Sequence, residues 1–156
     1  MKQNLYKIFG YAGAMPFLLL SGLACYFDVL KVTDVATLIV QILVAYAAII
    51  LSFLGGIHWP FAIQPRGARS QGKLFGRQLS NSMLPSIFGF MAVILSLSGM
   101  ADIALLCCAG LFWMVYIIDQ TFLSKADFPE GYFAFRRNIT AIVTIALLAT
   151  YLAVFV

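Results

Sequence analysis

Long runs without a charged side chain, separated by short charged segments, dominate this chain. Five such runs hold 20, 23, 24, 16 and 19 residues, at 8–27, 35–57, 78–101, 103–118 and 138–156. A helix rises about 1.5 Å per residue, so about 20 residues cross a hydrocarbon core about 30 Å thick. Four of the five runs are long enough alone. The run at 103–118 is long enough to span only when it is extended to Leu123.

The runs are continuously apolar rather than alternating, which argues against transmembrane strands, since these need only about 9–11 residues. Backbone groups in lipid must pair within their own segment, so each run is predicted to be a helix. The predicted fold is all-α, a single transmembrane domain over residues 1–156. Its five helices are expected near 8–27, 35–58, 80–100, 103–123 and 138–156.

Composition supports this class and excludes others. Hydrophobic residues make up 63% of the chain and charged residues only 10%, against about 25% charged in a soluble domain. An ordinary cytosolic domain, a disordered tail and a coiled coil are therefore excluded. The three cysteines have no paired-ligand spacing and His58 is the only histidine, so neither a metal nor a cofactor is expected.

The basic residues predict an orientation. Nine lie at the N-terminus and in the two long loops, and only Lys31 lies on the opposite side. Such a positive-inside bias places the N-terminus and long loops in the cytoplasm and the C-terminus outside. These basic segments are expected to contact anionic lipid rather than nucleic acid.

The start of the chain bears on localisation. The first run is interpreted as an uncleaved anchor, because only seven residues precede it and it reaches spanning length. A mitochondrial presequence would be longer and rich in arginine and serine, so a bacterial inner membrane is expected rather than a mitochondrial one.

Small residues predict where helices touch. In the second run Ala48, Ser52 and Gly56 recur every four residues, and Gly55 widens the groove they form. Gly10 and Ala14 repeat the pattern in the first run. Such small residues let helix backbones approach closely in membranes.

Polar side chains at membrane depth gather at the predicted cytoplasmic ends of the helices. Ionisable groups within a span are costly, and they usually face the protein interior with a partner. A short bundle would bring these side chains into one layer, and we take them as candidates for binding a ligand or a partner. They are His58, Trp59, Arg77, Asn81, Ser82, Tyr116, Asp119, Arg136 and Arg137.

Asp119 is the most informative of them, since it lies about one turn inside a helix that needs its length. Arg136 or Arg137 is the expected counter-charge, because a guanidinium pairs strongly with a carboxylate. Asp119 either pins two helices together or belongs to a ligand or proton site. His58 either caps the second helix or titrates near physiological pH.

The residues 51–59, Leu-Ser-Phe-Leu-Gly-Gly-Ile-His-Trp, close the second run and resemble the transmembrane protein 69-like family. The segment 81–85, the late Asp119 and the segment 132–140 fit the same resemblance. Members are small multi-helix membrane proteins built on a domain of unknown function. The resemblance implies the five-helix topology and a role for His58, and it implies no reaction.

Three functions remain open. The first is non-enzymatic binding of a partner, such as a membrane-complex subunit, or of an amphipathic ligand, such as a lipid or quinone, through the polar layer. The second is a small transporter or channel formed by oligomerisation. The third is a membrane enzyme acting on a lipid or isoprenoid with Asp119 or His58 as acid or base, although no catalytic motif is present.

Overall fold

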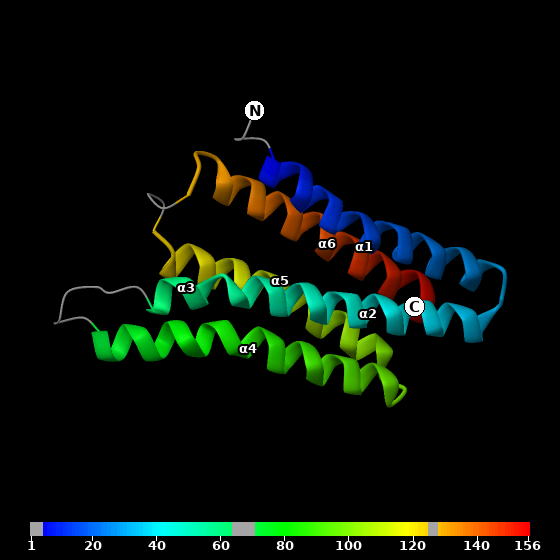
Figure 1. The fold of residues 1–156 in the computed structure, drawn as a ribbon. Coiled ribbons are helices and arrows are strands. Elements are labelled where there is room, and N and C mark those ends of the chain that lie inside the picture. Colours follow the sequence, from blue (N-terminus) through cyan, green and yellow to red (C-terminus); the bar gives the residue numbers. More distant parts are fainter. Residues whose placement is uncertain (1–4, 64–70, 125–127) are drawn as a thin grey trace.

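The computed structural model describes residues 5–63, 71–124 and 128–156, with the side chains of 61–63, 71–75 and 78 left out. Five long helices and one short helix make up this part of the chain (Figure 1): α1 (Leu5–Val29), α2 (Thr33–Gly56), α3 (His58–Ile63), α4 (Gln71–Leu97), α5 (Ala101–Phe122) and α6 (Tyr132–Phe155). Within the described residues, five helices are long and apolar enough to cross a membrane. The predicted all-α membrane bundle with five spans is confirmed.

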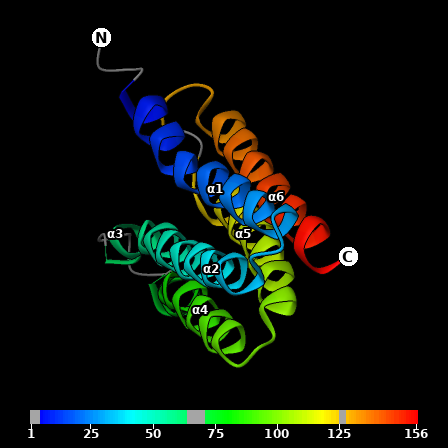
Figure 2. The ribbon, with the colours of Figure 1, turned by 90° about the vertical axis from the view of Figure 1, so that its right-hand side faces the viewer.

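The long helices form two layers, which are joined by α5 and by the contact of α1 with α2. Helix α1 packs against α6, α2 packs against α4, and α5 contacts α2, α4 and α6, as Figure 2 shows from the end of the bundle. The two layers lie together near the α1–α2 turn and diverge toward the end that holds the N-terminus (Figure 1). The C-terminus lies at the opposite end, which an odd number of crossings requires.

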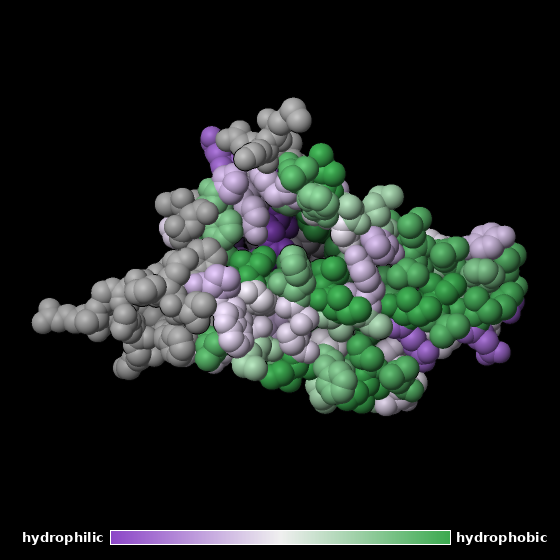
Figure 3. Space-filling model, viewed as in Figure 1, coloured by the Kyte–Doolittle hydropathy of each residue, from purple (hydrophilic) through white to green (hydrophobic). Residues whose placement is uncertain are grey.

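The surface is apolar around the bundle. Large side chains such as Phe9, Phe53 and Ile117 are exposed, and Figure 3 shows hydrophobic residues over much of the half near the α1–α2 turn. Soluble proteins rarely leave such extended apolar surface in water. These side chains suit contact with lipid.

Two helices begin earlier than the sequence predicts. Helix α4 begins at Gln71 rather than near 80, and α6 begins at Tyr132 rather than near 138. The predicted limits follow the charged residues, but arginine and glutamine are good helix formers and extend a helix beyond the hydrocarbon. The extension of α6 places Arg136 and Arg137 on a helix instead of in a loop.

The second predicted helix ends two residues early, at Gly56. Pro60 lacks the N–H that would bond to the Gly56 carbonyl, and its ring crowds that carbonyl. The Ile57 N–H donates to Leu54 O, three residues back, at 3.3 Å, and Ile57 keeps helical dihedrals (φ −60°, ψ −32°). The chain therefore continues in nearly the same direction into α3, whose first residue is His58.

Small residues bring α2 and α4 together at three levels. A Cβ built on Gly89 would lie 3.1 Å from the Cα of Ala48. One turn further along α2, the hydroxyls of Ser52 and Ser86 share a hydrogen bond of 2.9 Å. In lipid the hydrophobic effect does not drive helices together, so close backbone packing and interhelical hydrogen bonds stabilise their association.

The third level is the tightest. A Cβ on Gly55 would lie 2.5 Å from the backbone oxygen of Ser82 and 3.2 Å from Pro85. Gly56 lies outside this contact, since it is exposed and a Cβ there would meet nothing within 4 Å. The backbone of α4 therefore requires glycine at position 55 and tolerates a side chain at position 56.

Hydrogen bonds also tie α1 to its neighbours. Ser21 Oγ donates to Ala146 O at 2.9 Å, and Thr150 Oγ1 donates to Ser21 Oγ at 2.7 Å. Tyr46 Oη of α2 donates to Gly13 O at 3.0 Å. These bonds join α1 to α6 and α2 in the middle of the bundle and toward the α1–α2 turn.

The neighbouring glycines give a matched test of the α2–α4 contact. We expect Gly55→Ala to lower the free energy of unfolding by about 1–3 kcal/mol, the usual cost of overpacking. Gly56→Ala should cost nothing or stabilise slightly, because alanine favours the helix. Unfolding in mixed micelles, followed by circular dichroism, measures both, and equal stability of the two variants would contradict the close approach.

Candidate functional site

Three buried polar side chains from three parts of the chain meet at the diverging end of the bundle. His58 Nε2 lies 2.9 Å from Asp119 Oδ1, and Arg136 Nη2 donates to Asp119 Oδ2. His58 and Asp119 are fully buried and Arg136 is 6% exposed. We call these three residues the ion-paired cluster.

Helix periodicity directs two members of the cluster inward. Asp119 extends the buried stripe of α5, which runs through Leu105, Cys108, Phe112 and Val115. Arg136 begins the buried stripe of α6, which continues through Thr140, Val143, Leu147 and Thr150. Spacings of three and four residues keep side chains on one helix face. Arg137, about 100° further around the helix, is exposed.

The third member comes from the junction of α2 and α3. His58 is the first residue of α3, directly after the break that Pro60 imposes. An ionised carboxylate only accepts hydrogen bonds, so Nε2 must carry the proton that it donates to Asp119. The cluster therefore connects the α2–α3 segment, α5 and α6 through one carboxylate.

The cluster leaves hydrogen-bonding capacity unused. Arg136 Nε and His58 Nδ1 are buried and have no hydrogen-bond partner among the described residues. Buried polar atoms are nearly always paired, so each such atom is a place where a ligand or water can bind.

A cavity of about 380 Å³ opens beside the cluster, within the range of about 300–1,000 Å³ that is usual for small-molecule sites. We call it the aromatic cavity. Arg136 is the single charged side chain in its wall. The lining residues are Tyr6, Phe9, Gly10, Gly13, Ala14, Phe17, Ile50, Phe53, Leu54, Ile57, Phe112, Tyr132, Phe135, Arg136, Ile139 and Val143.

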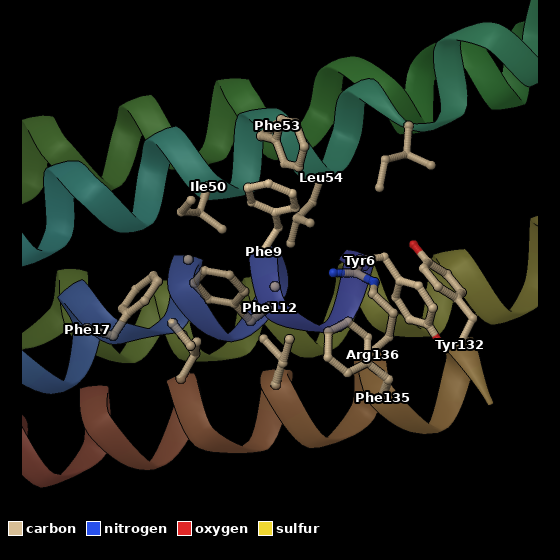
Figure 4. Close-up of a pocket in the computed structure, with 16 residues that line it drawn as sticks. Tyr6, Phe9, Phe17, Ile50, Phe53, Leu54, Phe112, Tyr132, Phe135 and Arg136 are labelled. Carbon is tan, nitrogen blue, oxygen red and sulfur yellow. The ribbon is translucent and has the colours of Figure 1, made fainter. Parts of the chain in front are cut away.

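Figure 4 shows how the wall is arranged. Tyr6, Tyr132 and Arg136 lie together at one end, and Phe17 lies at the other. Phe9 and Phe53 lie between α1 and α2 and are 68% and 70% exposed. The space-filling view has a hollow near the N-terminal end of α1, with hydrophilic atoms at its floor (Figure 3). The cavity can therefore be reached from the side of the bundle between α1 and α2.

The other predicted site residues lie apart from the cluster. Trp59 and Arg137 are exposed, and the guanidinium of Arg77, also exposed, lies 5.0 Å from the centre of the Phe122 ring. Tyr116 accepts a hydrogen bond from Gln120 rather than from the cluster.

Two more predicted residues lie on α4. Ser82 is buried and donates to Leu79 O at 2.7 Å. Asn81 is half-buried, and its Nδ2 has no partner within the part of the chain that the structure describes.

Sequence reasoning missed the contribution of α1. Its prediction that Gly10 is a packing residue is confirmed, because a Cβ there would collide with Phe135 and Ile139 of α6. It did not consider Tyr6, Phe9 or Gly13. The pattern does hold a signal, because two glycines three residues apart follow two aromatic residues. Glycines have no side chain, so the helix face that carries them can leave space beside the flat rings of the neighbouring aromatic residues. Only the neighbouring helix decides whether that space is filled.

The fold and this site define a multi-pass membrane protein with a buried ion-paired cluster beside an aromatic cavity. The family described as "Protein of unknown function (DUF3429)" matches residues 3–152, and the chain belongs to it.

One curated relative supports the predicted likeness to transmembrane protein 69. Transmembrane protein 69 of Xenopus tropicalis is 29% identical over 145 residues, which cover 90% of this chain and 51% of that protein. The chain spans about half the length of this relative. The relative is from a frog, so the likeness does not support the expectation of a bacterial membrane. No solved structure matches the chain.

The cluster predicts strong coupling between its charges. Asp119→Leu leaves a buried guanidinium without a counter-charge and should cost about 3–5 kcal/mol of unfolding free energy. The double variant Asp119→Leu, Arg136→Met removes both charges and should be more stable than Asp119→Leu alone. Unfolding of each variant in mixed micelles measures the coupling.

The adjacent arginine supplies the control. Arg137→Met should change stability by less than about 0.5 kcal/mol, as is usual for exposed positions. If the losses from Asp119→Leu and Arg136→Met simply add in the double variant, the two charges are not energetically paired.

Proposed function

We propose that this protein binds, without chemical conversion, an amphipathic molecule taken from the bilayer, and that the aromatic cavity is the site. The carrying observation is the Nε of Arg136, a buried donor with no partner among the described residues. It belongs to the one charged residue in the lining of an otherwise apolar cavity. Ligand pockets typically combine an apolar lining with a few polar groups that fix orientation. The apolar part of the ligand would contact the rings, and its polar end would accept from Arg136.

The position of the cavity supports entry from the membrane. Its lining includes the exposed Phe9 and Phe53 of two neighbouring spans. A molecule dissolved in lipid can reach this side without crossing water. The hydrogen bonds at Gly13 and Ser21 hold α1 against α2 and α6 further along, so the diverging end can stay open while the remainder stays packed.

The cavity gives less support to the alternative function, a transporter or channel in which a solute passes through the bundle. A transport path would need polar lining through the full depth, and Gln41 is the main polar side chain predicted in the outer half. Gln41 Nε2 donates to Ser96 O at 3.5 Å, and it does not line the aromatic cavity. The arrangement therefore favours binding from one side.

We also propose that the end with the cluster faces the cytoplasm, as it would in a bacterial inner membrane. The exposed Lys7, Arg77 and Arg137 lie at this end, and Lys31 lies at the other. Arg136 does not count toward the bias, because it is buried and paired with Asp119. The remaining basic side chains still favour this orientation and contact with anionic lipid.

A glycine in the cavity wall allows the binding site to be filled selectively. A Cβ on Gly13 or on Gly22 would meet nothing within 4 Å, and only Gly13 lines the cavity. Both lie on α1, so Gly13→Phe should abolish binding of a co-purified lipophilic molecule and Gly22→Phe should retain it. Native mass spectrometry from nanodiscs reads the bound mass, and retention in Gly13→Phe would refute this site.

Orientation is tested with fusions at the C-terminus in a bacterial host. Alkaline phosphatase is active only outside the cytoplasm. Green fluorescent protein becomes fluorescent in the cytoplasm and stays dark when it is exported as an unfolded chain. We expect an active phosphatase fusion and a dark fluorescent fusion. The opposite pair of results would reverse the proposed orientation without affecting the cavity.

A further inference from the structure

We propose that the polar end of the ligand is an uncharged ring carbonyl, so that the cavity takes a molecule of the quinone class rather than an anionic lipid or fatty acid. This inference rests on the proposed binding function and specifies the ligand. Three observations carry it: the charge balance of the Arg136–Asp119 pair, the unpartnered Nε of the arginine that lines the cavity and the chemistry of the lining.

The Arg136–Asp119 ion pair is already balanced in charge. The guanidinium of Arg136 is neutralised by the Asp119 carboxylate, and His58 donates to the same carboxylate. An anionic headgroup would add a negative charge beside a buried carboxylate, and the lining holds no second cation. Because uncompensated charge is costly in a low dielectric, an anion is disfavoured there.

Lys7 could serve an anion only from outside the cavity. Its Nζ lies 5.9 Å from the Tyr6 ring centre, but the side chain is exposed and does not line the wall. An anion held by Lys7 would therefore leave Arg136 Nε without its acceptor.

A carbonyl oxygen matches the free donor. Arg136 Nε is buried, has no acceptor among the described residues and belongs to the residue in the wall. A carbonyl can accept this N–H without changing the net charge of the site. The guanidinium donates through Nη2 to Asp119 and through Nε to the ligand, so both bonds can form at once.

The lining favours a ring over a saturated chain. Seven of the sixteen lining residues are aromatic: Tyr6, Phe9, Phe17, Phe53, Phe112, Tyr132 and Phe135. Aromatic side chains gain from offset-stacked or edge-to-face contact with another ring, beyond the burial of area. A saturated acyl chain obtains the burial alone.

The rings and the donor lie at the same end. Tyr6, Tyr132 and Phe135 lie around Arg136 in Figure 4, and the ring centres of Tyr6 and Phe135 are 5.3 Å apart in an edge-to-face arrangement. A ring carbonyl bonded to Arg136 would place its ring among these aromatic side chains. An apolar tail could then follow Ile50 and Phe17 or leave between α1 and α2.

The experiment compares three probes with the full chain in phosphatidylcholine nanodiscs. Decylubiquinone carries a neutral ring with carbonyls, dodecanoate is an anion, and dodecanol is a neutral chain without a ring. Equilibrium binding per mole fraction of lipid should be at least about tenfold tighter for decylubiquinone than for either other probe. Gly13→Phe should remove this binding and Gly22→Phe should not.

A conservative variant tests the contact with Arg136. Arg136→Lys keeps the charge beside Asp119 but has no N–H at the position of Nε. It should weaken decylubiquinone binding about three- to tenfold, as expected for one hydrogen bond. Arg137→Lys should change nothing. Should Arg136→Lys fail to fold, the ranking of the three probes on the unaltered chain still decides.

The outcomes separate the two proposals. Dodecanoate or dodecanol binding as tightly as decylubiquinone, with loss in Gly13→Phe, overturns the quinone class and leaves the binding function standing. Unchanged decylubiquinone affinity in Arg136→Lys overturns the carbonyl contact. If no probe binds, or none responds to Gly13→Phe, both the ligand class and the aromatic cavity as a binding site are refuted.

Discussion

A carboxylate buried in an apolar bundle needs its counter-charge, and this requirement determines how one end of the molecule is assembled. Asp119 binds Arg136 with one oxygen and His58 with the other, so α5, α6 and the α2–α3 segment cannot separate without exposing a charge to a low dielectric. The same pairing leaves Arg136 with a free Nε. Structural support and a potential binding group therefore come from one residue.

Close packing elsewhere leaves room at this end. Gly55 brings the backbones of α2 and α4 into close approach, and the hydroxyls of Ser52 and Ser86 share a hydrogen bond. Hydrogen bonds at Ser21 join α1 to α6. Each pair is tight within its own layer, while the layers diverge toward the cluster (Figure 1). The aromatic cavity lies where rings, rather than backbone contacts, separate α1 from α2.

The sequence determined the class, the five spans and the place of Asp119 near the end of its helix, because membrane helices must satisfy their own backbone and must match the bilayer thickness. These constraints are local, so the spacing of charged residues along the chain reveals them directly. The sequence also narrowed the possible partners of Asp119 to Arg136 and Arg137. It placed the start of α6 six residues late, because charge marks the edge of the hydrocarbon and not the end of a helix.

Only the tertiary structure decided the rest. Whether Arg136 or Arg137 faces Asp119 depends on the rotation of α6 against α5, and one residue turns a side chain by about 100°. Gly55 rather than Gly56 contacts α4 for the same reason. The cavity depends on how α1, α2, α5 and α6 pack at this end, and Gly13 lines it only in that arrangement. The sequence thus determined what each helix is, and the packing between helices decided which faces meet and where space remains.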